Sequence, residues 1–133
     1  MTYETILYSK SEGVATITLN RPEVLNALST TLFRELDTAI TEVESDEEVK
    51  AVIITGAGDR AFTAGADIHE MTRNAESDSP PPADPKRPTY AWHIGSCTKP
   101  TIGALNGLAY GCLLYTSDAA DDTPCVDLGG RRI

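Results

Sequence analysis

The sequence predicts an α/β fold whose first elements follow one another in the order strand, strand, helix, strand. Three observations support this class: two runs rich in β-branched and aromatic residues around a Gly-containing turn, a helical periodicity after them, and then a short continuous apolar run. At 133 residues the chain fits one domain, because a chain of this size buries about two-thirds of its unfolded surface on folding. We therefore expect a single core.

The first two strands are expected to form a β-hairpin. The segments "TYETILYS" and "GVATITLN" flank a turn of Ser11, Glu12 and Gly13. In the second segment alternate side chains point to opposite faces of a half-buried strand, with Ala15, Ile17 and Leu19 on one face and Val14, Thr16 and Thr18 on the other.

A helix is predicted to begin near Ser29, and residues Ser29 to Thr31 supply hydroxyls that can cap it. The apolar residues that follow recur at helical spacing: Leu32, Phe33, Leu36, Ala39, Ile40 and Val43. After the helix, "KAVIIT" is an unbroken apolar run, which predicts a parallel strand covered on both faces.

The second half of the chain is less regular. Five prolines between Asn74 and Thr89 argue against a helix or a central strand and predict an extended, mobile loop. Beyond it, "YAWHIGSC" is expected to form a short helix that ends by Pro100, and "TIGALNG" to return to strand and turn.

Composition excludes several classes of partner. The net charge of −9 argues against nucleic acid and anionic membranes. No apolar run reaches the length of about 18 residues that a spanning helix needs, and the N-terminus lacks the pattern of a signal peptide, so we expect a cytoplasmic protein. The cysteines Cys97, Cys112 and Cys125 are odd in number and lack metal-ligand spacing, which indicates free thiols and no bound metal.

Three stretches could carry chemistry. "GAGDRA", Gly56 to Ala61, matches a dinucleotide-binding turn, although a tight turn after a strand is the alternative because no long helical pattern follows. In "AFTAGADIHEM", Asp67 can cap a short helix and place the amide of Ala66 at its N-terminus, where an oxyanion would bind. "NGLAYG", Asn106 to Gly111, could bring up a second amide. Close-packed turns are the alternative for both.

Taken together, "LNRPEVLNAL" (19–28), "AFTAGADI" (61–68) and "NGLAYG" (106–111) resemble the enoyl-CoA hydratase/isomerase family, the crotonase superfamily. The resemblance covers residues 1 to about 111, the N-terminal part of a family domain roughly twice this long. It implies a spiral of β-β-α units, here truncated, and assembly as a homotrimer or homohexamer.

The resemblance also implies roles. The residues expected to bind coenzyme A are Ala64, Gly65, Ala66, Asp67 and Ile68, with Asn26, Ala27 and Leu28 beside the pantetheine and adenine and Arg21 near the phosphates. The Ala66 amide would be one oxyanion donor, and the other would come from the family's glycine run, which is Gly111 and Cys112 here. A Cys restricts φ where Gly would not. The ligand would be an acyl-CoA or enoyl-CoA thioester, with no cofactor beyond the coenzyme A of the substrate.

The expected reaction is water addition to an enoyl-CoA, or its isomerisation, through a thioester enolate held by two amides. In hydratases of the family the general acid and base are glutamates after the glycine run, whereas this chain has no Glu after Glu76. We therefore expect the fragment to be inactive. The alternatives are a non-catalytic fragment that binds coenzyme A thioesters or misassembles and, with less support, a dinucleotide-binding protein.

The last segment differs from the rest. Residues 112–133 carry four aspartates and no helical apolar stripe. They resemble the translation of a sequencing adapter, so we expect an unrelated, disordered tail. A native disordered tail is the alternative.

Overall fold

The computed structural model describes residues 2–76 and 92–110. The elements are β1 (Ile6–Ser11), β2 (Val14–Leu19), the 3₁₀ helix η1 (Pro22–Val24), α1 (Thr30–Ser45), β3 (Ala51–Gly56), β4 (Ala61–Thr63), α2 (Ile68–Glu76), α3 (Trp92–Gly95), β5 (Thr101–Ala104) and β6 (Leu108–Ala109). The predicted α/β class and element order are confirmed. Most of the proline-rich segment and the predicted tail 112–133 lie outside the described residues.

The main sheet has four strands in the order β1-β2-β3-β5. Strands β1 and β2 form the predicted antiparallel hairpin, with Ser11 opposite Val14. Both residues of its turn have positive φ, 50° at Glu12 and 79° at Gly13, which matches the twist of the flanking strands. Strand β3 is parallel to β2 and to β5, so this half of the prediction for "KAVIIT" is confirmed.

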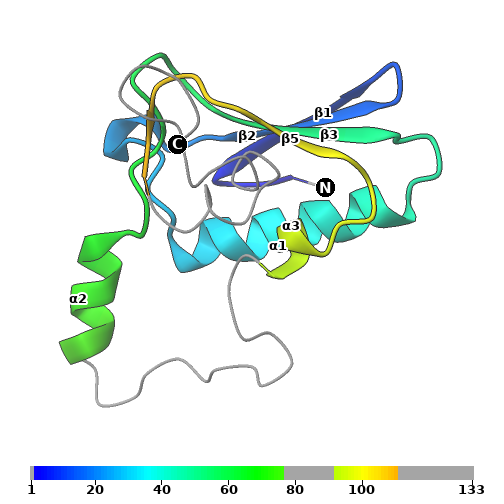
Figure 1. The fold of residues 1–133 in the computed structure, drawn as a ribbon. Helices are drawn as coiled ribbons and strands as arrows, with labels where there is room; N and C mark the ends of the chain where they lie inside the picture. Colours follow the sequence, from blue (N-terminus) through cyan, green and yellow to red (C-terminus); the bar gives the residue numbers. More distant parts are fainter. Residues whose placement is uncertain (1, 77–91, 111–133) are drawn as a thin grey trace, which may run out of the picture.

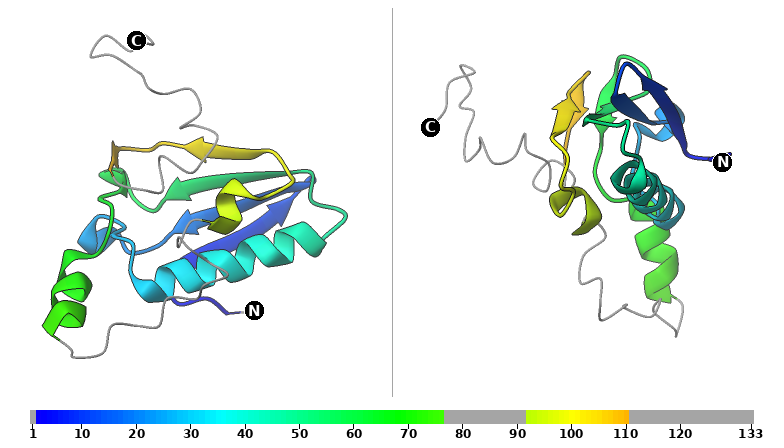
Figure 2. Two further views of the ribbon diagram at one scale, coloured as in Figure 1. Left: turned by 60° about the horizontal axis from the view of Figure 1, so that its bottom comes forward. Right: turned by 90° about the vertical axis from the view of Figure 1, so that its right-hand side faces the viewer.

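Helix α1 covers one face of this sheet, as Figures 1 and 2 show. The Ser29 hydroxyl accepts a hydrogen bond of 3.2 Å from the amide of Leu32, which confirms the predicted cap. All six apolar residues of the predicted stripe are buried: Leu32, Phe33, Leu36, Ala39, Ile40 and Val43. They pack against one of the two faces predicted for β2, whose residues Ala15, Ile17 and Leu19 are fully buried.

The elements after α1 repeat a pattern. Strands β3 and β4 and helix α2 form one unit, and strands β5 and β6 begin a second unit after α3. The first strands of the two units pair in the main sheet, and the second strands, β4 and β6, pair in a separate two-stranded sheet. Each unit therefore adds one strand to each of two sheets, which is the arrangement expected of a β-β-α spiral.

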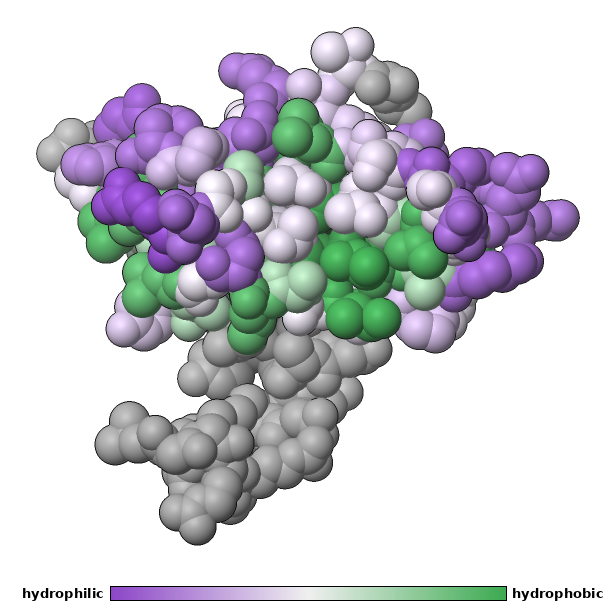
Figure 3. Space-filling model, turned by 90° about the horizontal axis from the view of Figure 1, so that it is seen from above, coloured by the Kyte–Doolittle hydropathy of each residue, from purple (hydrophilic) through white to green (hydrophobic). Residues whose placement is uncertain are grey.

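The second face of the main sheet is not covered by any described helix, so the expectation that β3 is covered on both faces is wrong for this structure. In β3, Val52 and Ile54 are buried but Ile53 is only half-buried, and its neighbour Ile102 on β5 is 53% exposed. We call this surface the open face (Figure 3). Its strand residues carry no charge: Leu7, Ser9, Ser11, Val14, Thr16, Thr18, Ala51, Ile53, Thr55, Ile102 and Ala104.

One boundary also differs from the prediction. Helix α2 continues to Glu76, so Asn74–Glu76 is helical rather than part of the proline-rich loop. The reason is that the first proline of that segment is Pro80, and a proline restricts only the residue before it and the turn it would occupy. The short helix α3 and strand β5 lie where they were predicted.

Candidate active site

The candidate site is built where the loop after β2 meets the loop after β4. A parallel bridge joins Leu28 to Ala66. In it the Leu28 amide donates to the Gly65 carbonyl over 2.8 Å, and the Asp67 amide donates to the Leu28 carbonyl over 3.1 Å. Because the backbone of Leu28 forms hydrogen bonds with Gly65 and Asp67, the residues on either side of Ala66, the amide and carbonyl of Ala66 itself point away from Leu28.

The amide of Ala66 is available to a ligand. The amide before it, from Gly65, donates to the Thr63 hydroxyl over 3.1 Å, and the amide after it is engaged by Leu28. Ala66 is exposed, and among the described residues its amide donates no hydrogen bond. Gly65 makes the turn possible with φ of 88°, a conformation that residues with a Cβ rarely adopt.

Helix α2 begins at Ile68, and Asp67 separates it from Ala66. Asp67 caps it as predicted, since its Oδ1 accepts a hydrogen bond of 3.2 Å from the Glu70 amide. The N-terminus of a helix carries a partial positive charge, so an anionic oxygen on the Ala66 amide would be stabilised by the helix as well. The sequence therefore identified both the capping residue and the position of the exposed amide.

A partly buried ion pair holds the two loops together. One nitrogen of Arg21, Nη1, lies 2.9 Å from Oδ2 of Asp67 and 2.7 Å from the carbonyl oxygen of Ala27. The two side chains are only 21% and 11% exposed. Burial opposes the charge on Asp67, but the hydrogen bonds from Arg21 and from the Glu70 amide lower its pKa below the ordinary value. Asp67 is therefore ionised while it caps the helix and binds Arg21.

Asn26 is the centre of the loop after β2. Its side chain is fully buried, accepts a hydrogen bond from the Arg21 amide over 3.0 Å, and donates to the carbonyls of Ala57 and Ala61 over 3.1 and 2.8 Å. Its φ is 54° and that of Leu25 is 55°. Consecutive left-handed residues other than glycine are costly and persist only where the surroundings fix them. The three hydrogen bonds of Asn26 supply that constraint.

Sequence reasoning gave Thr63 no role. This residue is fully buried, and its hydroxyl donates to the Asn26 carbonyl over 2.8 Å while accepting the Gly65 amide. It links the loop after β2 directly to the residue that precedes Ala66. A threonine at the end of a strand, two residues before a glycine, is the only signal, and it is too common to single out.

The third loop approaches the same place. The Asn106 side chain donates to the carbonyls of Gly56 and Gly58 over 2.9 and 2.7 Å, and the Tyr110 amide donates to the Thr63 carbonyl over 2.9 Å. "NGLAY" is therefore joined to the strand that leads into the Ala66 loop, as two cooperating loops require. Gly111 and Cys112, the expected second donor, lie outside the described residues.

The residues expected to bind coenzyme A differ in accessibility. Ile68 is 74% exposed beside Ala66, and Ala27 and Ala64 are half-buried. Asn26, Leu28 and Gly65 are buried, so their main role in this structure is to hold the loops in their conformation. Arg21 is engaged by Ala27 and Asp67 rather than extended toward solvent. A direct contact of these residues with coenzyme A stays a prediction.

The alternatives for these stretches are less well supported. In "GAGDRA", Gly58 has φ of 80° and the chain enters strand β4 instead of a helix, so the tight-turn interpretation is confirmed.

Within residues 2–76 and 92–110, no group of His, Cys, Asp or Glu side chains is arranged to hold a metal ion. In the same residues no helix is both long and apolar enough to cross a membrane.

The fold and the site together define a class: an α/β protein of repeated β-β-α units that presents a main-chain amide at the start of a helix. Comparison with known proteins gives the same class. The family model described as enoyl-CoA hydratase/isomerase matches residues 9–121. The chain therefore belongs to the enoyl-CoA hydratase/isomerase family, the crotonase superfamily, and the predicted resemblance is confirmed.

Individual relatives agree with this assignment. The chain is 42% identical over 112 residues to the probable enoyl-CoA hydratase echA8 of Mycobacterium bovis, and 39% identical over 111 residues to the short-chain-enoyl-CoA hydratase of Clostridium acetobutylicum. Both matches cover 84% of this chain but only 42% of the relative. The chain thus spans less than half the length of these relatives.

Solved structures show the same fold. The enoyl-CoA hydratase EchA8_6 of Mycobacterium marinum superposes with a TM-score of 0.76 at 31% identity, covering 86% of this chain and 56% of that one. An enoyl-CoA hydratase/isomerase of Xanthobacter autotrophicus Py2 gives a TM-score of 0.67 at 41% identity, covering 80% of this chain and 40% of that one. The crotonase-type fold class predicted from the sequence is confirmed, in a shortened form.

Proposed function

We propose that this chain binds the thioester group of an acyl-CoA or enoyl-CoA and that the Ala66 amide donates a hydrogen bond to the thioester carbonyl oxygen. The observation that carries the proposal is the free, exposed amide at the start of α2, between two amides that are both engaged. The names of the relatives, which are enoyl-CoA hydratases, support the class of ligand. Coenzyme A enters as part of the substrate, and we propose no further cofactor.

The chemistry follows from where charge develops. When water adds to the β carbon of an α,β-unsaturated thioester, electrons move onto the carbonyl oxygen and form an enolate. An amide held in place before the reaction stabilises this oxygen without reorganising. We propose the amide of Cys112, which follows Gly111, as the second donor. The exposed side chain of Ile68 would contact the bound ligand beside Ala66.

We propose that the 133 residues bind the thioester without turning it over. Hydration needs a general acid and base, which contribute roughly 10²- to 10⁴-fold, and this chain has no Glu after Glu76. A weakened second oxyanion donor would cost about 10²- to 10³-fold more. Water addition or isomerisation, and assembly as a trimer or hexamer, are proposed for a longer family domain.

A fragment that misassembles without binding ligand is the second candidate. The observation that favours it is the open face, where Ile102 and Leu7 are 53% and 54% exposed. The two candidates differ in one measurable property, because only the first predicts a specific change at the Ala66 amide when ligand is added.

The test is a titration of ¹⁵N-labelled protein with crotonyl-CoA, followed by the shift of the Ala66 amide signal, alongside loss of enoyl-thioester absorbance. We expect a saturable downfield shift and no turnover above the buffer rate. Ala66→Pro deletes the donor and should abolish binding, while Ala66→Gly keeps the amide and should bind as the wild type does. Equal binding by Ala66→Pro would contradict the proposed donor. Turnover that vanishes in this variant would contradict the proposed inactivity.

A further inference from the structure

A pocket lies away from the candidate active site, beside the first strand of the hairpin. It has a volume of about 270 Å³ and lies between the N-terminal arm, strand β1 and helix α1. Its lining residues are Thr2, Tyr3, Ile6, Leu7, Tyr8 and Glu42. None of them belongs to the three loops of the candidate active site. The pocket is therefore a separate feature of the molecule.

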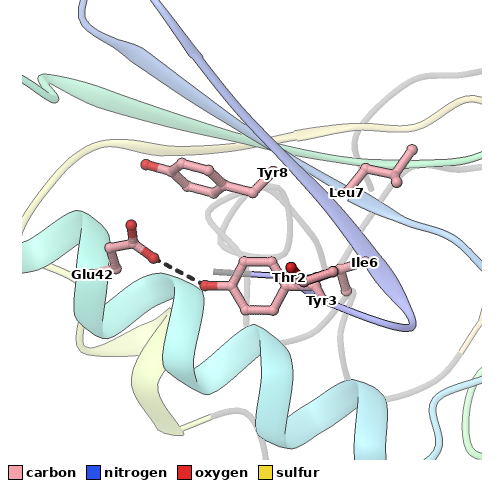
Figure 4. A pocket seen from close by; sticks show the side chains of 6 residues that line it. All are labelled: Thr2, Tyr3, Ile6, Leu7, Tyr8 and Glu42. Atoms are coloured by element: carbon pink, nitrogen blue, oxygen red, sulfur yellow. Dashed lines mark hydrogen bonds between the residues drawn. The ribbon is translucent and has the colours of Figure 1, made fainter.

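The polar groups of the pocket gather at one end. Figure 4 shows that the hydroxyls of Tyr3 and Tyr8 both point toward the end where the Glu42 carboxylate lies. The Tyr3 hydroxyl donates to Oε2 of Glu42 over 3.0 Å. Within the described residues, the other carboxylate oxygen of Glu42 and the Tyr8 hydroxyl make no hydrogen bond. Among the described residues, two acceptors at this end of the pocket thus lack a donor.

The surrounding charges favour a cation. Burial first, and then the hydrogen bond to Glu42 and the charges of Glu42 and Glu35, raise the pKa of Tyr3 to about 12. Burial and the charges of Glu42 and Asp46 likewise raise the pKa of Tyr8. Both phenols are therefore neutral at pH 7, and at Tyr8 the charges of Glu42 and Asp46 act against that of Lys10, which lowers the pKa.

The neighbouring charged side chains already have hydrogen-bond or ion-pair partners, whereas one carboxylate oxygen of Glu42 accepts no hydrogen bond from the described residues. Both oxygens of Glu35 accept hydrogen bonds from Glu4 and Thr5. The ammonium of Lys10 lies 2.8 Å from Asp46 and 2.7 Å from Glu48. Among the described residues, the Glu42 carboxylate has the neutral Tyr3 hydroxyl as its one donor. A half-buried carboxylate with one neutral partner is better stabilised by an added positive donor.

We propose that this pocket binds a primary alkylammonium group, with its nitrogen donating to Oε1 of Glu42 and to the Tyr8 hydroxyl oxygen, and its alkyl stem against Ile6 and the tyrosine rings. An ammonium beside a tyrosine ring gains an additional electrostatic attraction to the ring face. Ile6 is 1% exposed and provides an apolar floor for the stem. The ligand class is therefore a small primary amine in its protonated form.

The experiment uses the full chain with ¹³C-labelled tyrosine and n-butylammonium chloride as the probe. We expect saturable changes in the ring signals of Tyr3 and Tyr8. Sodium chloride at equal ionic strength and n-butanol, which has a similar shape but no charge, should leave these signals unchanged. Tetramethylammonium, which has no N–H to donate, should bind at least several-fold more weakly.

Two variants test the contacts separately. Glu42→Gln keeps an acceptor for Tyr3 but removes the charge, and should weaken n-butylammonium binding roughly tenfold or more. Tyr8→Leu should weaken it at least two- to fivefold, roughly, through loss of both the ring and the hydroxyl acceptor. Glu47→Gln, which removes an exposed carboxylate after α1, is the matched control and should bind as the wild type does. Equal responses to n-butylammonium and n-butanol, or unchanged affinity in both pocket variants, would overturn the proposal.

Discussion

At the residue scale, the site depends on a few buried polar side chains that connect distant loops. The ion pair between Arg21 and Asp67 and the hydrogen bond from Thr63 to Asn26 together fix the backbone on both sides of Ala66. None of these side chains is free to rearrange without leaving a buried group unpaired. The position of the proposed donor amide is therefore set by residues other than Ala66.

Asn26→Ala is expected to destabilise the fold. The substitution removes one acceptor from the Arg21 amide and the donor to the Ala57 and Ala61 carbonyls, leaving buried groups without partners. We expect the free energy of unfolding to fall by about 2 kcal/mol or more. Urea denaturation measures this loss. Thr41→Ala on the exposed face of α1 should change it by less than about 0.5 kcal/mol, and a similar small loss for Asn26→Ala would contradict the assigned role.

The Arg21–Asp67 pair should also make stability depend on pH. The pKa of Asp67 is lowered in the folded chain, so its contribution is fully present above the unfolded pKa of about 4 and is lost as pH falls through the folded pKa. The free energy of unfolding should therefore fall between about pH 5 and the folded pKa. Asp67→Asn should flatten this part of the profile.

The cause of that dependence can be checked with a second variant. Arg21→Gln removes the cation that lowers the Asp67 pKa, so it should flatten the same part of the profile while Asp67 remains. Urea midpoints measured across this pH range report the slope. If both variants keep the wild-type slope, the ion pair is not the source of the acid sensitivity.

The sequence carried the local features of the site but not its long-range contacts. Asp67 was identifiable as a cap and Ala66 as an exposed amide because both properties depend on residues within one helical turn. The pairing of Arg21 with Asp67 joins residues 46 positions apart, and no periodicity reports such a contact. Thr63 was missed for the same reason, since its partner Asn26 is 37 positions away.

At the element scale, α1 was the most predictable part of the chain because its apolar spacing records directly which face is buried. Its six stripe residues are all buried in the structure. Strand β3 was less predictable, because an apolar run of this length does not state how many of its faces are covered. Its sequence suits two covered faces, yet the described residues cover one.

Ser29→Ala is expected to destabilise α1 and, with it, the core that α1 covers. The substitution removes the hydroxyl that accepts the Leu32 amide at the start of the helix. The expected loss is about 1 kcal/mol in the free energy of unfolding, measured by thermal or urea denaturation. Ser29→Asp restores an acceptor and should recover most of the loss. Equal stability of the alanine and aspartate variants would show that the cap is energetically unimportant.

At the scale of the whole molecule, charge and apolar surface are separated. The chain has a net charge of −9, yet the strand residues of the open face carry no charge. Exposed apolar surface beyond a few hundred Å² usually mediates association. The net negative charge makes copies of the chain repel one another, whereas the uncharged open face adds no such repulsion.

The chain is therefore expected to self-associate through the open face. Ile102→Lys places a charge beside Ile53 and should shift the population toward monomer, while Thr38→Lys on the exposed side of α1 should leave the association unchanged. Sedimentation velocity over a range of protein concentrations measures the effect. A monodisperse monomer at every concentration, for the unsubstituted chain, would contradict this expectation.

The repeated β-β-α order has a consequence for how such a chain folds during synthesis. The loop of residues 21–28 and the loop of residues 63–67 close on each other through contacts that involve nothing beyond residue 70. These contacts can form as soon as α2 has left the ribosome, since translation proceeds far more slowly than a loop closes. The Ala66 amide would thus be positioned early, and the next two strands would pair with β3 and β4, which are already in place, rather than begin a new core.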